Sequence, residues 1–226
     1  GETLAKRVIS TVPPSEIDTI VPVPESSRPS AMQLAQKLGI PYREGFVKNR
    51  YVGRTFIMPG QATRKKSVRQ KLNAIASEFK GKRVLLVDDS IVRGTTSREI
   101  VQMARDAGAS KVYLASAAPP VRFPNVYGID MPTSEELIAN GRTVEDIRTY
   151  IGCDALIYQD LEAMKRAIRE VNPRVTGFEA SCFDGHYITG ITQENLAEMR
   201  AERLVNQDGD EAMESDSLTL PNTEDA

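Results

Sequence analysis

The segment from Val84 to Ala117 constrains the fold more than any other part of this 226-residue chain. The apolar run Val84-Leu-Leu-Val87 is followed by two carboxylates, a small polar turn, a helical pattern over about 97–107, Gly108 and a second apolar run over 112–117. Two such runs joined through a helix are typical of neighbouring parallel strands. Parallel sheets are covered by helices on their faces. The segment therefore predicts an α/β fold.

The remaining chain shows the patterns of further helices and strands. Helices are expected over residues 2–10, 30–38, 68–79 and 161–171, and strands over residues 18–24 and 42–47. Shorter helices are expected after Thr133 or Ser134 and after Thr143, which are residue types that favour a helix start. Residues 49–67 show no sustained period. A loop this long inside a compact domain is either a functional lid or a disordered insertion.

Charge is distributed unevenly along the chain, which has 29 Lys and Arg residues against 31 Asp and Glu residues. Residues 206–226 contain seven acids and no base, and they are poor in large apolar side chains. Such a segment cannot offset its ordering entropy by burial, so we expect a disordered acidic tail. Residues 43–71 contain nine basic side chains and one acid, Glu44. This concentration indicates either a solvated loop or contact with something anionic.

The cysteine count and the hydropathy pattern predict a cytoplasmic protein. Two cysteines, Cys153 and Cys182, are too few for a disulfide-stapled secreted fold or for a four-cysteine metal or iron-sulfur site. No apolar run approaches the roughly 20 residues that span a bilayer, and the first residues lack the apolar stretch of a signal peptide. Residue 1 is Gly rather than Met, so we expect a processed chain or a domain of a longer polypeptide.

The turn after the first apolar run carries the residues with the most chemistry. Asp88 and Asp89 follow a predicted buried strand, at the sheet edge where open α/β folds bind ligands. Gly94 and the hydroxyls at 90 and 95–97, just before a helix, suit a phosphate. Two carboxylates would repel a phosphate, so they better suit sugar hydroxyls or a divalent cation. A helix cap beside a solvated acid is the purely structural alternative, but the combination favours a phosphorylated ribose.

Several separated motifs resemble one family of enzymes. The residues at 84–96 are VLLVDDSIVRGTT, which resembles the phosphoribosyl pyrophosphate (PRPP) signature of the type I phosphoribosyltransferases. Further matches are VPVPESSRPSA at 21–31, KNRYVGRTFIMPGQATRKKSVRQKLN at 48–73 and YLASAAPPVRFPNVYGIDMPTSEELIANGR at 113–142. Together they resemble the carboxy-terminal half of the glutamine phosphoribosylpyrophosphate amidotransferases (amidophosphoribosyltransferases), which open de novo purine synthesis. The resemblance implies a type I phosphoribosyltransferase-like parallel sheet with a mobile lid loop.

The resemblance extends to about Thr192 and implies the domain boundaries. Residues 1–192 are expected to form a phosphoribosyltransferase domain, residues 193–205 a C-terminal helix, and residues 206–226 the acidic disordered tail. Whole family members begin with a glutaminase domain whose catalytic residue is an amino-terminal cysteine. Residue 1 here is Gly, so we expect that domain to be absent and this chain to use ammonia.

The resemblance also implies roles for individual residues. It assigns Asp88 and Asp89 to the ribose hydroxyls. It assigns the 5-phosphate to a turn formed by Ser90, Ile91, Val92, Arg93, Gly94, Thr95 and Thr96. It assigns the pyrophosphate to Glu25, Ser26, Ser27 and Arg28, and Mg²⁺ to Ser26, Asp88 and Asp89. It assigns a catalytic role to Arg54 and Lys71, which would close over the pyrophosphate and stabilise the charge of the leaving group. It assigns contact with a feedback nucleotide to Lys48 and Ser67.

The implied reaction joins ammonia to PRPP and gives 5-phosphoribosylamine and pyrophosphate. The implied cofactor is Mg²⁺. Some members carry an iron-sulfur cluster held by four cysteines, and this chain, with two cysteines, is similar to the members without one. Purine nucleotides are implied as inhibitors, and the glutaminase domain as a partner in the full-length chain. We also expect a homo-oligomer, and we expect neither nucleic acid nor a membrane as a partner.

Two other functions remain open on the sequence. One is a non-catalytic regulator of the same fold that binds PRPP or nucleotide and uses its basic segment on nucleic acid. The acidic tail and the net charge of −2 argue against it. The other is a salvage enzyme that couples PRPP to a nucleobase. The PRPP signature alone does not exclude salvage, but the motifs at 48–73 and 113–142 do not resemble salvage enzymes.

Overall fold

The structure is a computed structural model that describes residues 1–49, 72–129, 131, 133–192 and 195. The chain divides into two compact units, residues 1–185 and residues 186–226. The elements that carry the candidate site all lie in the first unit. The predicted C-terminal helix and acidic tail fall on residues of which only Asn195 is described.

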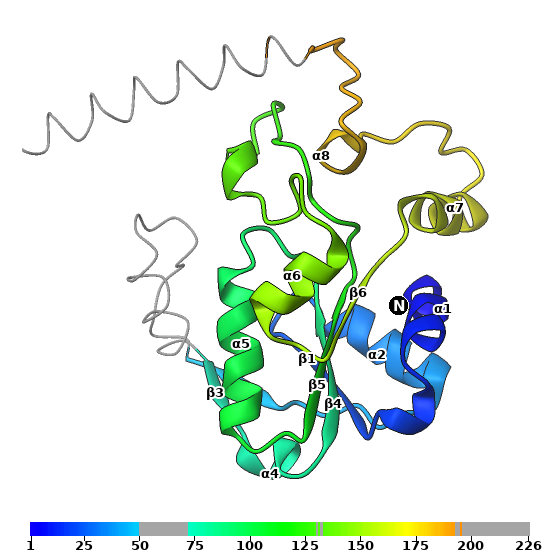
Figure 1. Ribbon diagram of the computed structural model, residues 1–226. Helices are drawn as coiled ribbons and strands as arrows, with labels where there is room; N and C mark the ends of the chain where they lie inside the picture. The colour runs from blue at the N-terminus through cyan, green and yellow to red at the C-terminus, as the bar shows by residue number, and fades with distance from the viewer. Residues whose placement is uncertain (50–71, 130, 132, 193–194, 196–226) are drawn as a thin grey trace, which may run out of the picture. The chain divides into compact units, whose positions relative to one another are not determined.

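A four-stranded parallel sheet forms the centre of the first unit (Figure 1). Its strands are β1 (Thr19–Pro22), β4 (Arg83–Asp88), β5 (Lys111–Ser116) and β6 (Ala155–Tyr158), in the order β1-β4-β5-β6. The α/β fold and the crossover between β4 and β5 are thus confirmed. The strand β6 was not predicted, because a four-residue apolar run cannot be told from part of a helix by its period.

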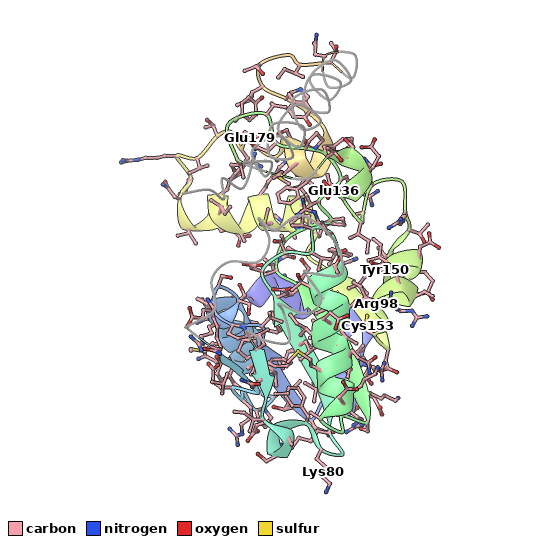
Figure 2. The ribbon with its side chains drawn as sticks, turned by 90° about the vertical axis from the view of Figure 1, so that its left-hand side faces the viewer. Lys80, Arg98, Glu136, Tyr150, Cys153 and Glu179 are labelled. Atoms are coloured by element: carbon pink, nitrogen blue, oxygen red, sulfur yellow. The ribbon has the colours of Figure 1, made fainter. Side chains whose placement is uncertain are left out.

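Helices cover both faces of the sheet. They are α1 (Glu2–Thr11) and α2 (Arg28–Leu38) on one face, and α5 (Thr95–Asp106) and α6 (Val144–Ile151) on the other (Figure 1). Side chains alternate along β4, so Leu86 joins the buried cluster that includes Ile100 of α5, whereas Leu85 joins the cluster that includes Leu34 of α2. Arg98 of α5 lies over the ring of Tyr150 of α6, 5.4 Å from its centroid (Figure 2).

Further elements complete the first unit. They are the 3₁₀ helices η1 (Pro14–Glu16) and η2 (Ser134–Glu136) and the helices α4 (Ala76–Phe79), α7 (Leu161–Val171) and α8 (Ser181–Asp184). The predicted helix at 161–171 is confirmed as α7. The predicted start of α6 is also confirmed, since Thr143 Oγ1 accepts the Asp146 N–H at 3.2 Å. Within the described part of the chain, no helix combines the length and the apolar character needed to cross a bilayer.

A second, two-stranded sheet pairs β2 (Phe46–Lys48) with β3 (Leu72–Ala74) in antiparallel register. The predicted helix over 68–79 is therefore wrong at Leu72–Ala74, and within residues 72–79 only Ala76–Phe79 is helical. The physical reason is pairing with β2, a long-range contact that overrides the local pattern. Lys48 and Leu72 are register partners, so the two ends of the intervening segment are adjacent.

Gly94 closes the turn between β4 and α5 with a backbone φ of +73°. A Cβ at this position would lie 2.3 Å from Cδ1 of Ile138. The Ile138 N–H also donates to the Val92 carbonyl at 2.9 Å. Glycine is required here both for its backbone freedom and for the close approach of Ile138.

An ion pair joins the amino ends of β1 and β4. The Asp18 carboxylate accepts the Arg83 backbone N–H at 2.7 Å, its Nε–H at 3.1 Å and its Nη2–H at 2.7 Å. These hydrogen bonds lower the pKa of Asp18 from 3.8 to about 2. The pair ties together two strands that are distant in sequence, at the edge of the sheet opposite to Asp88.

The Gly94→Ala variant should lose about 2–5 kcal/mol of unfolding free energy, because a clash with Ile138 adds to the strain of a positive φ. Gly81→Ala is the matched control, since Gly81 has the same φ of +73° and open space around an added Cβ. It should lose only about 1–2 kcal/mol. Denaturant unfolding measures both losses, and equal losses would contradict the packing role of Ile138.

The Asp18→Asn variant should lose about 0.5–1 kcal/mol of stability at pH 7, within the range of exposed ion pairs. Because the folded-state pKa of Asp18 lies below its ordinary value, this contribution is complete above pH 4 to 5 and is lost as the pH falls toward 2. The deficit of the variant should therefore be about halved at pH 3. Urea unfolding at several pH values tests this, and a deficit that is constant from pH 7 to pH 3 would contradict it.

Candidate active site

Asp88 and Asp89 lie at the carboxyl end of β4, at the place the sequence predicts. Asp88 is 9% exposed and Asp89 is exposed. An oxygen of Asp88 accepts the Asp89 N–H at 2.9 Å, and an oxygen of Asp89 accepts the Ser90 N–H at 2.6 Å. Burial, together with the negative charge of Asp89, raises the pKa of Asp88 to about 8. A cation or a set of hydrogen-bond donors brought by a ligand would stabilise its ionised form.

The loop after β1, residues 23–28, reaches this acid pair. The Ser26 hydroxyl donates to Oδ2 of Asp89 at 2.5 Å, across 63 positions of sequence. The Val23 N–H donates to the Val87 carbonyl at 2.8 Å, which continues the pairing of β1 with β4 to the base of both loops. Two segments that the sequence singles out separately are therefore in direct contact.

Within this loop the four predicted residues have different environments. Ser27 is fully buried and its hydroxyl donates to the Val23 carbonyl, so that side chain holds the loop together. Glu25 and Ser26 are exposed, and the peptide bond between Pro24 and Glu25 is cis. Arg28 begins α2. Ser26 is thus the loop hydroxyl that faces the acid pair.

The turn after Asp89 leads into the amino end of α5. Thr95 is buried, Thr96 is exposed, and no side chain caps this end of the helix. Free N–H groups at the start of a 12-residue helix favour an anion through hydrogen bonds and through the helix dipole. Ile91 is buried in the core, so the contribution of its position to a ligand is limited to the backbone.

Two arginines of the predicted site are paired with acids from other segments. Arg93 Nε lies 3.0 Å from Oε1 of Glu136, and Arg28 Nε lies 3.0 Å from Oε1 of Glu44. Glu136 comes from η2 and is labelled in Figure 2. Sequence reasoning missed both acids as site residues. Glu44 did leave a signal, as the one acid among nine basic residues.

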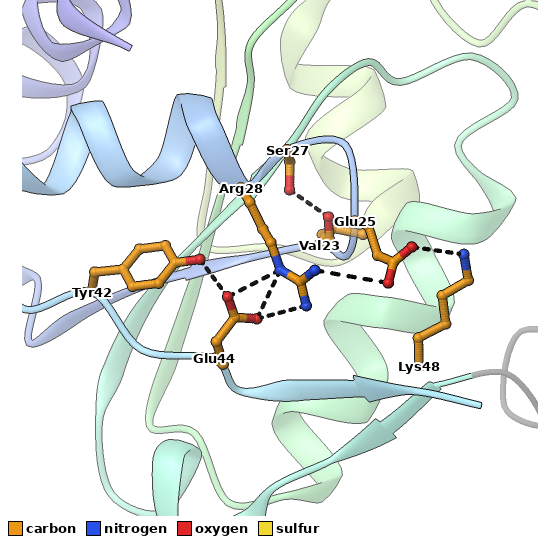
Figure 3. A network of polar contacts seen from close by, with 7 residues as sticks. All are labelled: Val23, Glu25, Ser27, Arg28, Tyr42, Glu44 and Lys48. Atoms are coloured by element: carbon orange, nitrogen blue, oxygen red, sulfur yellow. Dashed lines mark hydrogen bonds and ion pairs between the residues drawn. The ribbon is translucent and has the colours of Figure 1, made fainter. Parts of the chain in front are cut away.

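Lys48 ends β2 and lies beside the 23–28 loop. Its Nζ is 3.5 Å from Oε2 of Glu25, within a network of polar contacts that also includes Arg28 and Glu44 (Figure 3). Arg54, Ser67 and Lys71 lie outside the described residues. Of the predicted residues, those of the 23–28 loop, the 88–96 segment and Lys48 are therefore the ones that the structure places.

The side-chain oxygens of Ser26, Asp88 and Asp89 form the set that could hold a divalent cation. They are hard oxygen donors. Burial, and after it the negative charge of Asp89, raises the pKa of Asp88, and a nearby cation would favour the ionised carboxylate. In the parts of the chain that are described, His, Cys, Asp and Glu form no group of three or more arranged to hold a metal. A cation here would therefore need further oxygens from a ligand.

Comparison with known proteins assigns the fold to a family. A family profile described as "Phosphoribosyl transferase domain" matches residues 1–121. Amidophosphoribosyltransferase of Pseudomonas aeruginosa is 58% identical over 194 residues, which are 86% of this chain and 39% of that protein. Amidophosphoribosyltransferase of Escherichia coli is 60% identical over 189 residues, which are 84% of this chain and 37% of that protein. The chain thus spans about two fifths of the length of these curated relatives.

A solved structure shares the fold. It is glutamine phosphoribosylpyrophosphate (PRPP) amidotransferase from B. subtilis complexed with ADP and GMP, with a TM-score of 0.71 and 47% identity, covering 85% of this chain and 42% of that one. This confirms the parallel sheet flanked by helices as the type I phosphoribosyltransferase fold. Because the profile covers more than half of the chain and includes both loops that meet at the acid pair, the chain belongs to the phosphoribosyl transferase domain family.

Proposed function

We propose that this chain carries out the phosphoribosyl transfer of the amidophosphoribosyltransferases. The bond between the anomeric carbon of PRPP and its pyrophosphate oxygen breaks, and that carbon forms a bond to the nitrogen of ammonia. The products are 5-phosphoribosylamine and pyrophosphate, and the proton that the nitrogen loses passes to solvent. The hydrogen bond between Ser26 and Asp89 carries the proposal, because it joins the loops proposed to hold opposite ends of PRPP. The relatives' names favour it over nucleobase salvage or a non-catalytic regulator.

The two loops and the acid pair would divide the substrate among them. N–H groups of the 90–94 turn and of the start of α5 would donate to the 5-phosphate. Asp88 and Asp89 would accept hydrogen bonds from the ribose hydroxyls. N–H groups of residues 25–28 would contact the pyrophosphate. Arg54 and Lys71 would stabilise the charge that develops on the leaving pyrophosphate.

Mg²⁺ fits the donor set of Ser26, Asp88 and Asp89. When bound together with PRPP, it would supply positive charge against the pyrophosphate. The two carboxylates and the serine hydroxyl would hold it from the protein side. The chain's own residues would then position the sugar.

The remaining parts of the proposal concern regulation and assembly. Lys48 and Ser67 would contact a feedback purine nucleotide, a proposal supported by the nucleotides named for the B. subtilis structure. A glutaminase domain would supply ammonia in a longer polypeptide, since the curated relatives are more than twice the length of this chain. We further propose a phosphoribosyltransferase domain over residues 1–192, a homo-oligomeric assembly and a cytoplasmic location.

The double variant Asp88→Asn, Asp89→Asn should weaken PRPP binding at least about a hundredfold in the presence of Mg²⁺, because it removes the charge that holds the cation and the ribose hydroxyls. The fold should persist, since Asp88 is a buried acid with a raised pKa. The control is Glu16→Gln, Asp18→Asn, which removes two charges at the opposite edge of the sheet. Calorimetric titration measures the affinities. If the Asp88→Asn, Asp89→Asn variant bound PRPP as tightly as the unaltered chain, the proposed PRPP site would be wrong.

The chain should release pyrophosphate from PRPP with ammonium as the nitrogen source and should ignore glutamine. Neutral ammonia is a nucleophile without further activation, so the rate should rise with pH as ammonium deprotonates. A coupled pyrophosphate assay with each donor tests this, and the Asp88→Asn, Asp89→Asn variant provides the blank. Turnover supported by glutamine in this chain alone would refute the division of labour proposed above.

A further inference from the structure

Glu44 is the centre of a polar network beside the 23–28 loop (Figure 3). Its carboxylate accepts hydrogen bonds from Arg28 Nε at 3.0 and 3.3 Å and from Arg28 Nη2 at 3.3 Å. It also accepts the Tyr42 hydroxyl at 2.5 Å. A planar guanidinium held through two nitrogens by one carboxylate has a defined orientation as well as a favourable energy. Glu44 therefore fixes where the Arg28 side chain lies.

The network continues from Arg28 into the loop itself. Arg28 Nη1 lies 3.8 Å from Oε1 of Glu25, and Lys48 Nζ lies 3.5 Å from Oε2 of the same carboxylate. Glu44, just before β2, and Lys48, at its end, thus anchor both ends of the segment Glu25–Arg28. Ser26, whose hydroxyl contacts Asp89, lies between these two anchored ends.

Exposure of these side chains separates a positioning role from a role in stability. The Arg28 and Glu44 side chains are 41% and 43% exposed. Ion pairs this exposed add little to the free energy of folding. The free energy that holds a short loop in one conformation is small compared with the free energy of global unfolding. Contacts that contribute little to global stability therefore have a large effect on the conformation of the loop. Removing the Glu44 charge should therefore disturb the loop while the fold persists.

We propose that Glu44 is a positioning residue that acts through Arg28 to hold the 25–28 loop in the conformation that receives the pyrophosphate end of the substrate. The identity of the ligand in this inference rests on the proposed function. The effect of Glu44 on the loop conformation does not. Glu44 holds the Arg28 guanidinium beside the residues that precede β2, so that residues 25–28 keep one conformation, with the Ser26 hydroxyl on Asp89.

Glu44→Gln tests the proposal, since it keeps the size of the side chain and removes its charge. PRPP affinity with Mg²⁺ should fall about tenfold, with the thermal unfolding midpoint unchanged. Glu16→Gln is the matched control, because Glu16 is a 45% exposed acid whose Oε2 lies 3.1 Å from Arg83 Nη1. It should bind PRPP as the unaltered chain does. Because Glu44 acts through Arg28, the double variant Arg28→Gln, Glu44→Gln should bind within about twofold of Arg28→Gln alone.

A second measurement needs no substrate. Exchange of the Arg28 amide, whose N–H donates to the Glu25 carbonyl at 3.4 Å and closes the 25–28 loop, should be faster in Glu44→Gln than in the unaltered chain and unchanged in Glu16→Gln. If the unaltered chain fails to bind PRPP, the proposed function falls and exchange alone decides the role of Glu44. If that chain binds PRPP and Glu44→Gln matches it in affinity and exchange, the role of Glu44 falls and the proposed function stands. A lowered unfolding midpoint or additive losses in the double variant would overturn it too.

Discussion

The parallel pairing of β1 with β4 is the constraint on which the candidate site depends. Because of this pairing, the loops at 23–28 and 89–94 leave the sheet at the same edge. The hydrogen bond from the Val23 N–H to the Val87 carbonyl is the last one between the two strands. From there Ser26 reaches Asp89. Buried apolar side chains on both faces of β4 hold that register, because a shift by one residue would turn Leu85 and Leu86 to the wrong clusters. The acid pair owes its position to the core beneath it.

Much of this arrangement could be predicted from sequence because it is encoded locally. The run from Val84 to Ala117 contains a strand, a turn with Gly94, a helix and a second strand, and each follows from the period and the turn residues. The strand β3 and the strand β6 could not be predicted in this way. Both are short, and their strand character comes from partners far along the chain.

The site was predictable to a similar degree and for the same reason. Asp88, Asp89 and the hydroxyls of the following turn are adjacent in sequence, so their shared location was visible. The pairing of Arg28 with Glu44 and of Arg93 with Glu136 was not, because it depends on which segments the fold brings together. The resemblance assigned both arginines to ligand contacts, and those roles stay predictions. The structure adds an acid partner for each.

The antiparallel ladder between β2 and β3 has a consequence for how such a domain diversifies. Since Lys48 faces Leu72 across that ladder, the 23 residues from 49 to 71 join two positions that are register partners. Exchanging this stretch for one of another length or composition would leave the surrounding sheet, its register and the acid pair in place. Evolution can therefore change this stretch without rebuilding the sheet that carries Asp88 and Asp89.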